Sequence, residues 1–171
     1  MNSSLKPDIQ QKLASIKLLV LDVDGTLTDG GLYYTDSGEE LKKFNVKDGQ
    51  GIKLLMRSEV AVAIITASTS KATRHRAKKL GIEHVFVGVE DKLTQLKMLC
   101  QTLNVDLGEV GYVGDDINDI PVMKAVGAPM TLANGMALNQ DCAIYTTKRA
   151  GGDGAVREIC DLIIDSQATL S

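Results

Sequence analysis

Residues 16–24 read I-K-L-L-V-L-D-V-D, an apolar run that stops at Asp22 and is followed two residues later by Asp24. A run this short and this apolar is typical of a β-strand that is buried on both faces of a parallel sheet. The next residue, Gly25, favours a turn. The stretch therefore predicts a strand over residues 16–21 that delivers two carboxylates to its carboxyl end.

The rest of the chain alternates between apolar runs and helical patterns. Further strands are predicted at residues 60–65, 85–87, 110–113, 128–132 and 143–146. Helices are predicted at residues 8–15, 49–58, 70–80, 91–103, 118–125 and 154–165. Strands that alternate with helices imply βαβ units. We therefore predict an α/β fold with a doubly wound, Rossmann-like parallel sheet and helices on both faces.

Residues 28–44 break this alternation. Tyr, Leu and Phe flank the turn-forming sequence Asp36-Ser37-Gly38, a pattern that favours a β-hairpin. The hairpin would be inserted directly after the first strand. No repeat, linker or low-complexity run divides the sequence, so we expect a single domain over residues 1–171.

The composition of the chain argues against several classes of function. The 171 residues carry a net charge of −3, which is not the basic footprint of a nucleic-acid-binding protein. The 3 cysteines form no CxxC pair, so reduced thiols in a cytoplasmic protein are expected. No apolar run approaches the about 18 residues of a membrane span, and the N-terminus lacks the apolar core of a secretory signal. We expect a cytoplasmic protein that binds neither nucleic acid nor membranes.

Polar residues with catalytic potential follow the predicted strands. They are Asp22, Asp24, Thr66, Lys92, Asp115, Asp116 and Asp119. Open parallel sheets bind ligands outside the carboxyl ends of their strands, so these side chains should converge. Clustered carboxylates are a hard-oxygen site that suits Mg²⁺ together with a phosphate group. The set therefore predicts phosphoryl chemistry.

Each residue type fits a step of that chemistry. Asp22 can attack a phosphoryl group and form an aspartyl-phosphate. Lys92 offers a fixed positive charge to the transferring group, and Thr66 offers a hydroxyl donor. Asp24 lies past the strand, where it can protonate the leaving oxygen and then activate water.

These motifs resemble those of a known superfamily. D-V-D-G-T-L-T-D (residues 22–29) is similar to the first signature of the haloacid-dehalogenase-like superfamily, and G-D-D-I-N-D (residues 114–119) to the fourth. I-I-T (residues 64–66) and Lys92 match the second and third in order and spacing. A short hairpin without a full cap domain resembles the capless branch. The resemblance implies a Mg²⁺-dependent phosphatase.

The resemblance also implies a role for each position. Asp22 would be nucleophile and metal ligand, Asp24 would be acid/base and bind the metal through its backbone carbonyl, and Asp115 would be the second metal carboxylate. Thr66 and Lys92 would hold the phosphoryl oxygens, and Asp116 and Asp119 would be supporting acids. Substrate contacts are expected from Asp24, Asn45, Val46, Lys47, Asp48, Gly49, Ser68, Arg76 and Lys92.

Within that branch, four stretches resemble the 3-deoxy-D-manno-octulosonate 8-phosphate phosphatases: residues 28–34, 43–49, 88–93 and 149–158. This implies hydrolysis of that sugar-acid phosphate, in lipopolysaccharide biosynthesis, by a homotetramer packed through its hairpins. Residues 149–154 would then reach a neighbour's active site. One alternative is a phosphatase for a nine-carbon sugar-acid 9-phosphate. Another is a phospho-accepting receiver domain, although receivers lack an acid/base two residues after the phospho-acceptor.

One position departs from the family pattern. The family usually reads T-G-R after the second strand, whereas this chain reads Thr66-Ala67-Ser68. Ser68 can donate one neutral hydrogen bond where Arg would grip an anion with two. Losing a charge-assisted contact costs about 1.5–3 kcal/mol of binding, unless Lys71 or Arg74 compensates. The substitution therefore bears on substrate identity and not on the catalytic set.

Overall fold

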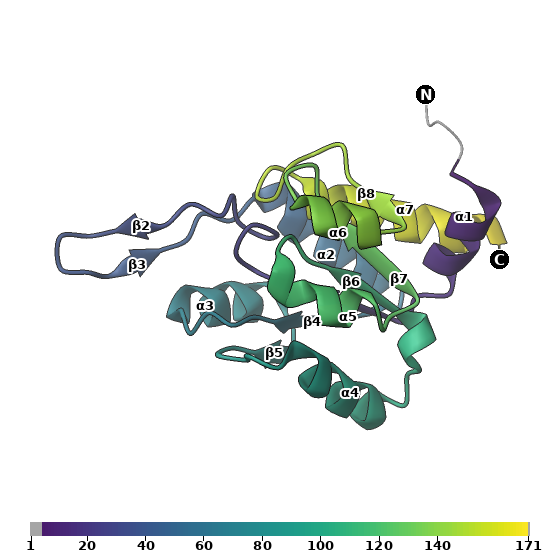
Figure 1. Ribbon diagram of the computed structural model, residues 1–171, viewed down its shortest axis with the longest axis horizontal. Helices are drawn as coiled ribbons and strands as arrows, with labels where there is room; N and C mark the ends of the chain where they lie inside the picture. Colours follow the sequence, from purple (N-terminus) through teal and green to yellow (C-terminus); the bar gives the residue numbers. More distant parts are fainter. Residues whose placement is uncertain (1–4, 171) are drawn as a thin grey trace.

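The computed structural model describes residues 5–170, and its centre is a parallel sheet between two layers of helices (Figure 1). The strands lie in the order β5-β4-β1-β6-β7-β8. Their bounds are β1 (Leu18–Leu21), β4 (Ala61–Ile65), β5 (His84–Phe86), β6 (Val110–Val113), β7 (Ala128–Thr131) and β8 (Tyr145–Thr146). The predicted doubly wound α/β fold, including both late strands, is confirmed.

The central strand β1 is buried on both faces, as its sequence predicts. Leu19 and Leu21 belong to one apolar core, Leu18 and Val20 to the other, and all four are fully buried. Because successive side chains of a strand point to opposite faces, an uninterrupted apolar run fills two cores at once. In register, Leu21 pairs with Ile64 of β4 and with Val113 of β6, so these strands end at the same edge of the sheet.

Two layers of helices cover the sheet. One face carries α1 (Pro7–Ala14), α2 (Val46–Arg57), α3 (Lys71–Leu80) and α7 (Ala155–Leu170), and the other carries α4 (Lys92–Leu103) and α5 (Ile120–Met123). No helix within residues 5–170 has both the length and the apolar character needed to cross a bilayer.

Three helix predictions need correction. α2 begins at residue 46 instead of 49 because the side chain of Asn45 accepts the N–H of Lys47 at 2.8 Å and caps the helix. The predicted helix 118–125 is instead a 3₁₀ turn (Ile117–Asp119) and the short α5, with Pro121 in its first turn. The helix predicted to end at residue 165 continues to Leu170 as α7. The sequence pattern gave no sign of α6 (Ala137–Cys142), and a further 3₁₀ turn (Leu107–Glu109) precedes β6.

The inserted segment forms the predicted hairpin and extends away from the sheet (Figure 1). Strands β2 (Tyr33–Tyr34) and β3 (Glu40–Leu41) are antiparallel, and Gly38 adopts a φ of +83° in the turn between them. A single bridge between Thr28 and Phe44 closes the base of the hairpin. The hairpin therefore begins and ends beside the loop that follows β1.

Candidate active site

The loops after β1 and β6 and the first turn of α4 meet at one edge of the sheet. The Nζ of Lys92 donates to Oδ1 of Asp22 at 2.8 Å and to Oδ1 of Asp119 at 2.7 Å. Asp22 and Lys92 are 70 residues apart in the chain. The structure thus brings together residues that the sequence analysis placed at separate strand ends.

Lys92 is a buried cation held at the start of a helix. The side chain of Asp91 accepts the N–H of Thr94 at 3.0 Å and caps α4, which makes Lys92 the first helical residue. Burial alone would lower the pKa of Lys92, but the carboxylates of Asp22 and Asp119 outweigh it and raise the pKa. Lys92 is therefore a permanent positive charge at the site.

Asp119 is held in place by hydrogen bonds to both of its carboxylate oxygens, so it is not a free metal ligand. Its Oδ1 accepts from Lys92 and, at 2.5 Å, from the hydroxyl of the buried Tyr112. Its Oδ2 accepts the backbone N–H groups of Asp115 at 3.0 Å and Asp116 at 3.3 Å. With both oxygens engaged, Asp119 fixes Lys92 and shapes the turn that carries Asp115. The Asp116 side chain instead caps the following turn by accepting the N–H of Ile117.

Asp115 and Asp22 form a pair of carboxylates suited to a divalent cation. One oxygen each from Asp22, Asp115 and Asp119 lie within 4.8 Å of one another. Oδ1 of Asp115 is buried and has no hydrogen-bond partner among the described residues. A side chain at Gly25, whose φ is +82°, would place Cβ 2.0 Å from the other oxygen of Asp115, so only glycine lets the two loops approach this closely.

The electrostatics of this pair favour the same conclusion. Burial raises the pKa of Asp22 to about 6, although Lys92 opposes the shift. Burial and the charge of Asp22 raise the pKa of Asp115 to about 7. A bound divalent cation would offset this crowding of carboxylates, and hard carboxylate oxygens are the ligands that Mg²⁺ takes. The residues present therefore fit Mg²⁺.

Thr66 lies at the end of β4, where its hydroxyl remains able to donate. It is buried, and its Oγ1 accepts the N–H of Ser68 at 3.1 Å, which leaves the hydroxyl hydrogen for an anion. The Oγ of Ser68 accepts the N–H of Ser70 at 3.3 Å, and its carbonyl accepts the N–H of Gly88. Ser68 is half-buried and contributes to the turn that leads into α3.

Asp24 contacts Lys42, which was not among the predicted site residues. Asp24 is half-exposed, and one of its carboxylate oxygens accepts from Nζ of Lys42 at 2.5 Å. Lys42 follows β3 directly, within a charged stretch of the hairpin that reads as a solvated face. Nothing in the spacing of the sequence distinguishes it from Lys43, its exposed neighbour.

Two of the residues predicted to contact substrate also have structural contacts. Asp48 is buried, and its Oδ1 accepts the N–H of Arg157 at 2.9 Å, so it caps the start of α7. Gly49 is buried beneath Arg76, whose guanidinium would lie 2.4 Å from a Cβ at this position. That residues 45–49 line the substrate site stays a prediction, and within this range Val46 and Lys47 are exposed.

Arg76 and Asn45 fasten the junction between the hairpin and α2. The guanidinium of Arg76 donates to the carbonyl of Asn45 at 3.1 Å and lies 5.8 Å from the centroid of the Phe44 ring. The side-chain amide of Asn45 donates to the carbonyl of Gly152 at 3.2 Å. Both residues thus hold the backbone of this junction in place.

The glycine-rich segment before α7 packs on its own chain. The N–H of Gly152 donates to the carbonyl of Thr26 at 3.2 Å, and a Cβ at Gly151 would lie 1.8 Å from the carbonyl oxygen of Gly25. The expectation that residues 149–154 reach a neighbour's site concerns the assembly and stays a prediction. The missing side chains of Gly151 and Gly152 permit a backbone contact that braces the loop carrying Asp24.

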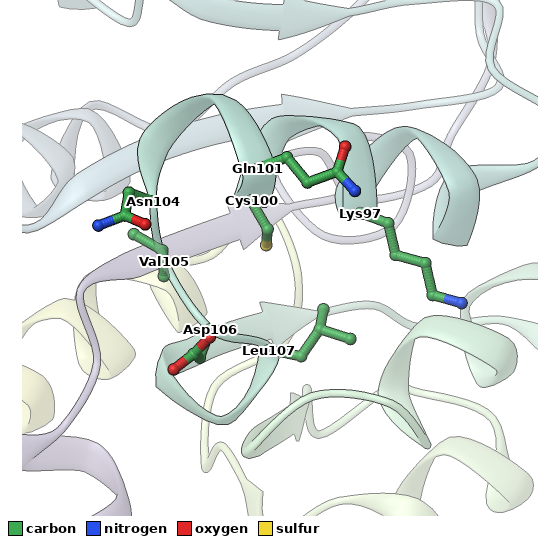
Figure 2. A pocket seen from close by; sticks show the side chains of 7 residues that line it. All are labelled: Lys97, Cys100, Gln101, Asn104, Val105, Asp106 and Leu107. Atoms are coloured by element: carbon green, nitrogen blue, oxygen red, sulfur yellow. The ribbon is translucent and has the colours of Figure 1, made fainter.

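A hollow of about 460 Å³ at the end of α4 has no part in this site (Figure 2). Lys97, Gln101 and Asp106 are among the residues that line it. Because α4 begins beside the catalytic edge with Lys92 and runs back along the sheet, its last turn lies at the opposite edge. The hollow contains none of the catalytic candidates.

Comparisons with known proteins agree with this geometry. The haloacid dehalogenase-like hydrolase family matches residues 88–159. The 3-deoxy-D-manno-octulosonate 8-phosphate phosphatase KdsC of Yersinia pestis is 46% identical over 163 residues, which span 95% of this chain and 87% of that protein.

Two solved structures of such phosphatases share the fold. The crystal structure from Yersinia pestis matches with a TM-score of 0.93 and 46% identity, covering 96% of this chain and 89% of that one. The crystal structure from Moraxella catarrhalis, in complex with a magnesium ion, a phosphate ion and a KDO molecule, matches with a TM-score of 0.92 and 41% identity, covering 95% and 93%.

Proposed function

The chain belongs to the haloacid dehalogenase-like hydrolases, and from that premise we propose that it hydrolyses 3-deoxy-D-manno-octulosonate 8-phosphate to the free sugar acid and phosphate. It is a Mg²⁺-dependent phosphoric monoester hydrolase. The observation that carries this conclusion is the contact of Lys92 with Asp22 at the sheet edge, in a chain 46% identical to an enzyme of that activity.

The first step transfers the phosphoryl group to the protein. A carboxylate oxygen of Asp22 forms a bond to phosphorus while the bond from phosphorus to the sugar oxygen breaks. Asp24 gives its proton to that departing oxygen. Lys92 and the hydroxyl of Thr66 hold the phosphoryl oxygens in place.

The second step releases phosphate. Asp24, now a carboxylate, takes a proton from water as the water oxygen bonds to phosphorus and the bond to Asp22 breaks. Asp22 and Asp115, with the backbone carbonyl of Asp24, would hold Mg²⁺, which supplies positive charge to the transferring group. Asp116 and Asp119 support this set through the turn that they stabilise.

Two alternatives make different predictions. A nine-carbon sugar-acid 9-phosphate would be handled by the same residues, and the curated relatives do not favour it. A phospho-accepting receiver would stop after the first step, whereas Asp24 can act as the base in the second step.

The assembly and setting of the enzyme are part of the proposal. We expect one domain over residues 1–171, a homotetramer that packs through the hairpins, and a cytoplasmic enzyme of lipopolysaccharide biosynthesis. The hairpin supports the tetramer because Leu32, Tyr34 and Leu41 are each more than half exposed, which is costly for an isolated subunit. Light scattering coupled to gel filtration would measure the mass, and a monomer would contradict the assembly.

The activity is tested by phosphate release from the eight-carbon and nine-carbon substrates, each with Mg²⁺ and with chelator. We expect multiple turnovers on the eight-carbon substrate that stop when the metal is removed. Preference for the nine-carbon substrate would transfer the assignment to it. A single turnover that leaves a stable phosphoprotein would indicate a receiver instead.

A further inference from the structure

Lys42 is a cation buried at the base of the hairpin. Its side chain is only 3% exposed, and its Nζ contacts Oδ1 of Asp24 at 2.5 Å and Oε1 of Glu40 at 2.9 Å. A buried ammonium group is costly unless it is paired. The two carboxylates supply this pairing, and together they fix where the ammonium lies.

The backbone around Lys42 is constrained on both sides. β3 (Glu40–Leu41) precedes it in the antiparallel pair, and the bridge between Thr28 and Phe44 follows two residues later. Arg76 then holds the carbonyl of Asn45. Lys42 therefore reaches Asp24 from a rigid part of the hairpin and not from a free loop.

Asp24 has less support from the sheet than its partners have. Asp22 accepts a hydrogen bond from a lysine of α4, and Asp119 accepts hydrogen bonds from two side chains and two backbone N–H groups. The described side-chain contact of Asp24 is the one with Lys42. The orientation of its carboxylate thus depends on the hairpin.

We propose that Lys42 is a positioning residue that holds the carboxylate of Asp24 toward the oxygen of the leaving group, so that the hairpin sets the geometry of proton transfer. This inference rests on the proposed function, in which Asp24 protonates the sugar oxygen. As the proton leaves, negative charge develops on Asp24, and the ammonium of Lys42 lies beside it. Glu40 keeps Lys42 in place.

This role has a signature that a purely structural role lacks. Cleavage of a sugar phosphate expels a poor leaving group and needs the proton from Asp24. Cleavage of p-nitrophenyl phosphate expels a phenolate that departs without protonation. The ratio kcat/KM reports the steps up to this bond cleavage, so a defect in positioning Asp24 should reduce kcat/KM for the first substrate and spare it for the second.

The experiment compares Lys42→Met with Lys43→Met on both substrates in the presence of Mg²⁺. Lys43 is the matched control because it is 62% exposed and pairs with Asp29 at the surface. We expect Lys42→Met to lower kcat/KM for the sugar phosphate about 100-fold and for p-nitrophenyl phosphate no more than about threefold. Lys43→Met should resemble the wild type, and Lys42→Arg should recover part of the loss.

Equal losses on both substrates, or no loss at all, would overturn the proposal. If Lys42→Met does not fold, Glu40→Gln removes the second partner of Lys42 and leaves the cation. A smaller loss confined to the sugar phosphate would then support the proposal, and a uniform loss or none would reject it. A wild-type chain that releases phosphate from neither substrate would instead reject the proposed function.

Discussion

Two buried lysines hold the two halves of the site, and they come from different parts of the molecule. Lys92 begins a helix of the sheet core and contacts Asp22 and Asp119. Lys42 lies at the base of the hairpin and contacts Asp24 and Glu40. In the proposed mechanism, the sheet organises the side of the site that takes the phosphoryl group, whereas the hairpin organises the side that meets the leaving group. In both halves of the site, a buried lysine lies between two carboxylates.

The largest effect should come from Asp22→Asn or Asp24→Asn, which remove the proposed nucleophile or the proposed acid/base without changing side-chain size. We expect Asp24→Asn to abolish turnover and spare folding, because Asp24 is half-exposed and lies outside the core. Multiple-turnover phosphate release and circular dichroism would measure the two properties. Turnover that survives Asp24→Asn would contradict its role and the division of the site into two halves.

Lys92→Met should damage both activity and stability. It leaves the carboxylates of Asp22 and Asp119 buried without their cation, and breaking such a buried pair costs about 3–5 kcal/mol. Lys42→Met should cost less, since Asp24 and Glu40 are both partly exposed. Urea denaturation of the two variants would compare their free energies of unfolding. Equal costs would show that the hairpin base is as deeply integrated as the sheet edge.

Tyr112→Phe should have an intermediate effect. It removes the hydroxyl that donates to Oδ1 of Asp119 and leaves Lys92 as the remaining donor to that oxygen. A hydrogen bond to a charged group contributes about 1.5–3 kcal/mol. We expect a loss of this size in the free energy of unfolding and a fall in kcat. An unchanged kcat would show that Asp119 needs only Lys92 and its backbone donors.

Ser68→Arg should have the smallest effect and the opposite sign. It introduces the guanidinium that the family usually carries at this position. If it recovers the lower end of the about 1.5–3 kcal/mol of such a contact, KM for the eight-carbon substrate should fall about tenfold. The hydrogen bonds of Ser68 are with Thr66, Ser70 and Gly88 and serve the turn before α3, so kcat should be unchanged. Steady-state kinetics would measure both constants. A raised KM would show that this chain accommodates its substrate through other residues.

The sheet could be predicted from the sequence, but the contacts between distant segments could not. The apolar run before Asp22 predicted a strand buried on both faces, and the register then placed Asp22 and Thr66 at one edge. The role of Lys42 could not be predicted, because its pairing with Asp24 depends on how the hairpin packs against the loop after β1. Tyr112 gave no signal beyond an aromatic residue in an apolar strand.

The residues near α2 illustrate a second limit. Asp48 is a candidate for binding substrate because the resemblance to the phosphatases includes residues 43–49. In the fold it caps α7, whose first residues are more than a hundred positions away. Capping across such a distance leaves no local pattern, because the helix that needs the carboxylate is elsewhere in the sequence.

The contact between Gly152 and Thr26 has a consequence for synthesis. The loop after β1, with Asp22 and Asp24, is synthesised well before Gly152, which braces it. At about 5–20 residues per second, the two are separated by on the order of ten seconds of translation. A nascent chain that has not yet reached Gly152 therefore carries Asp22 and Asp24 beside a loop that lacks this backbone contact.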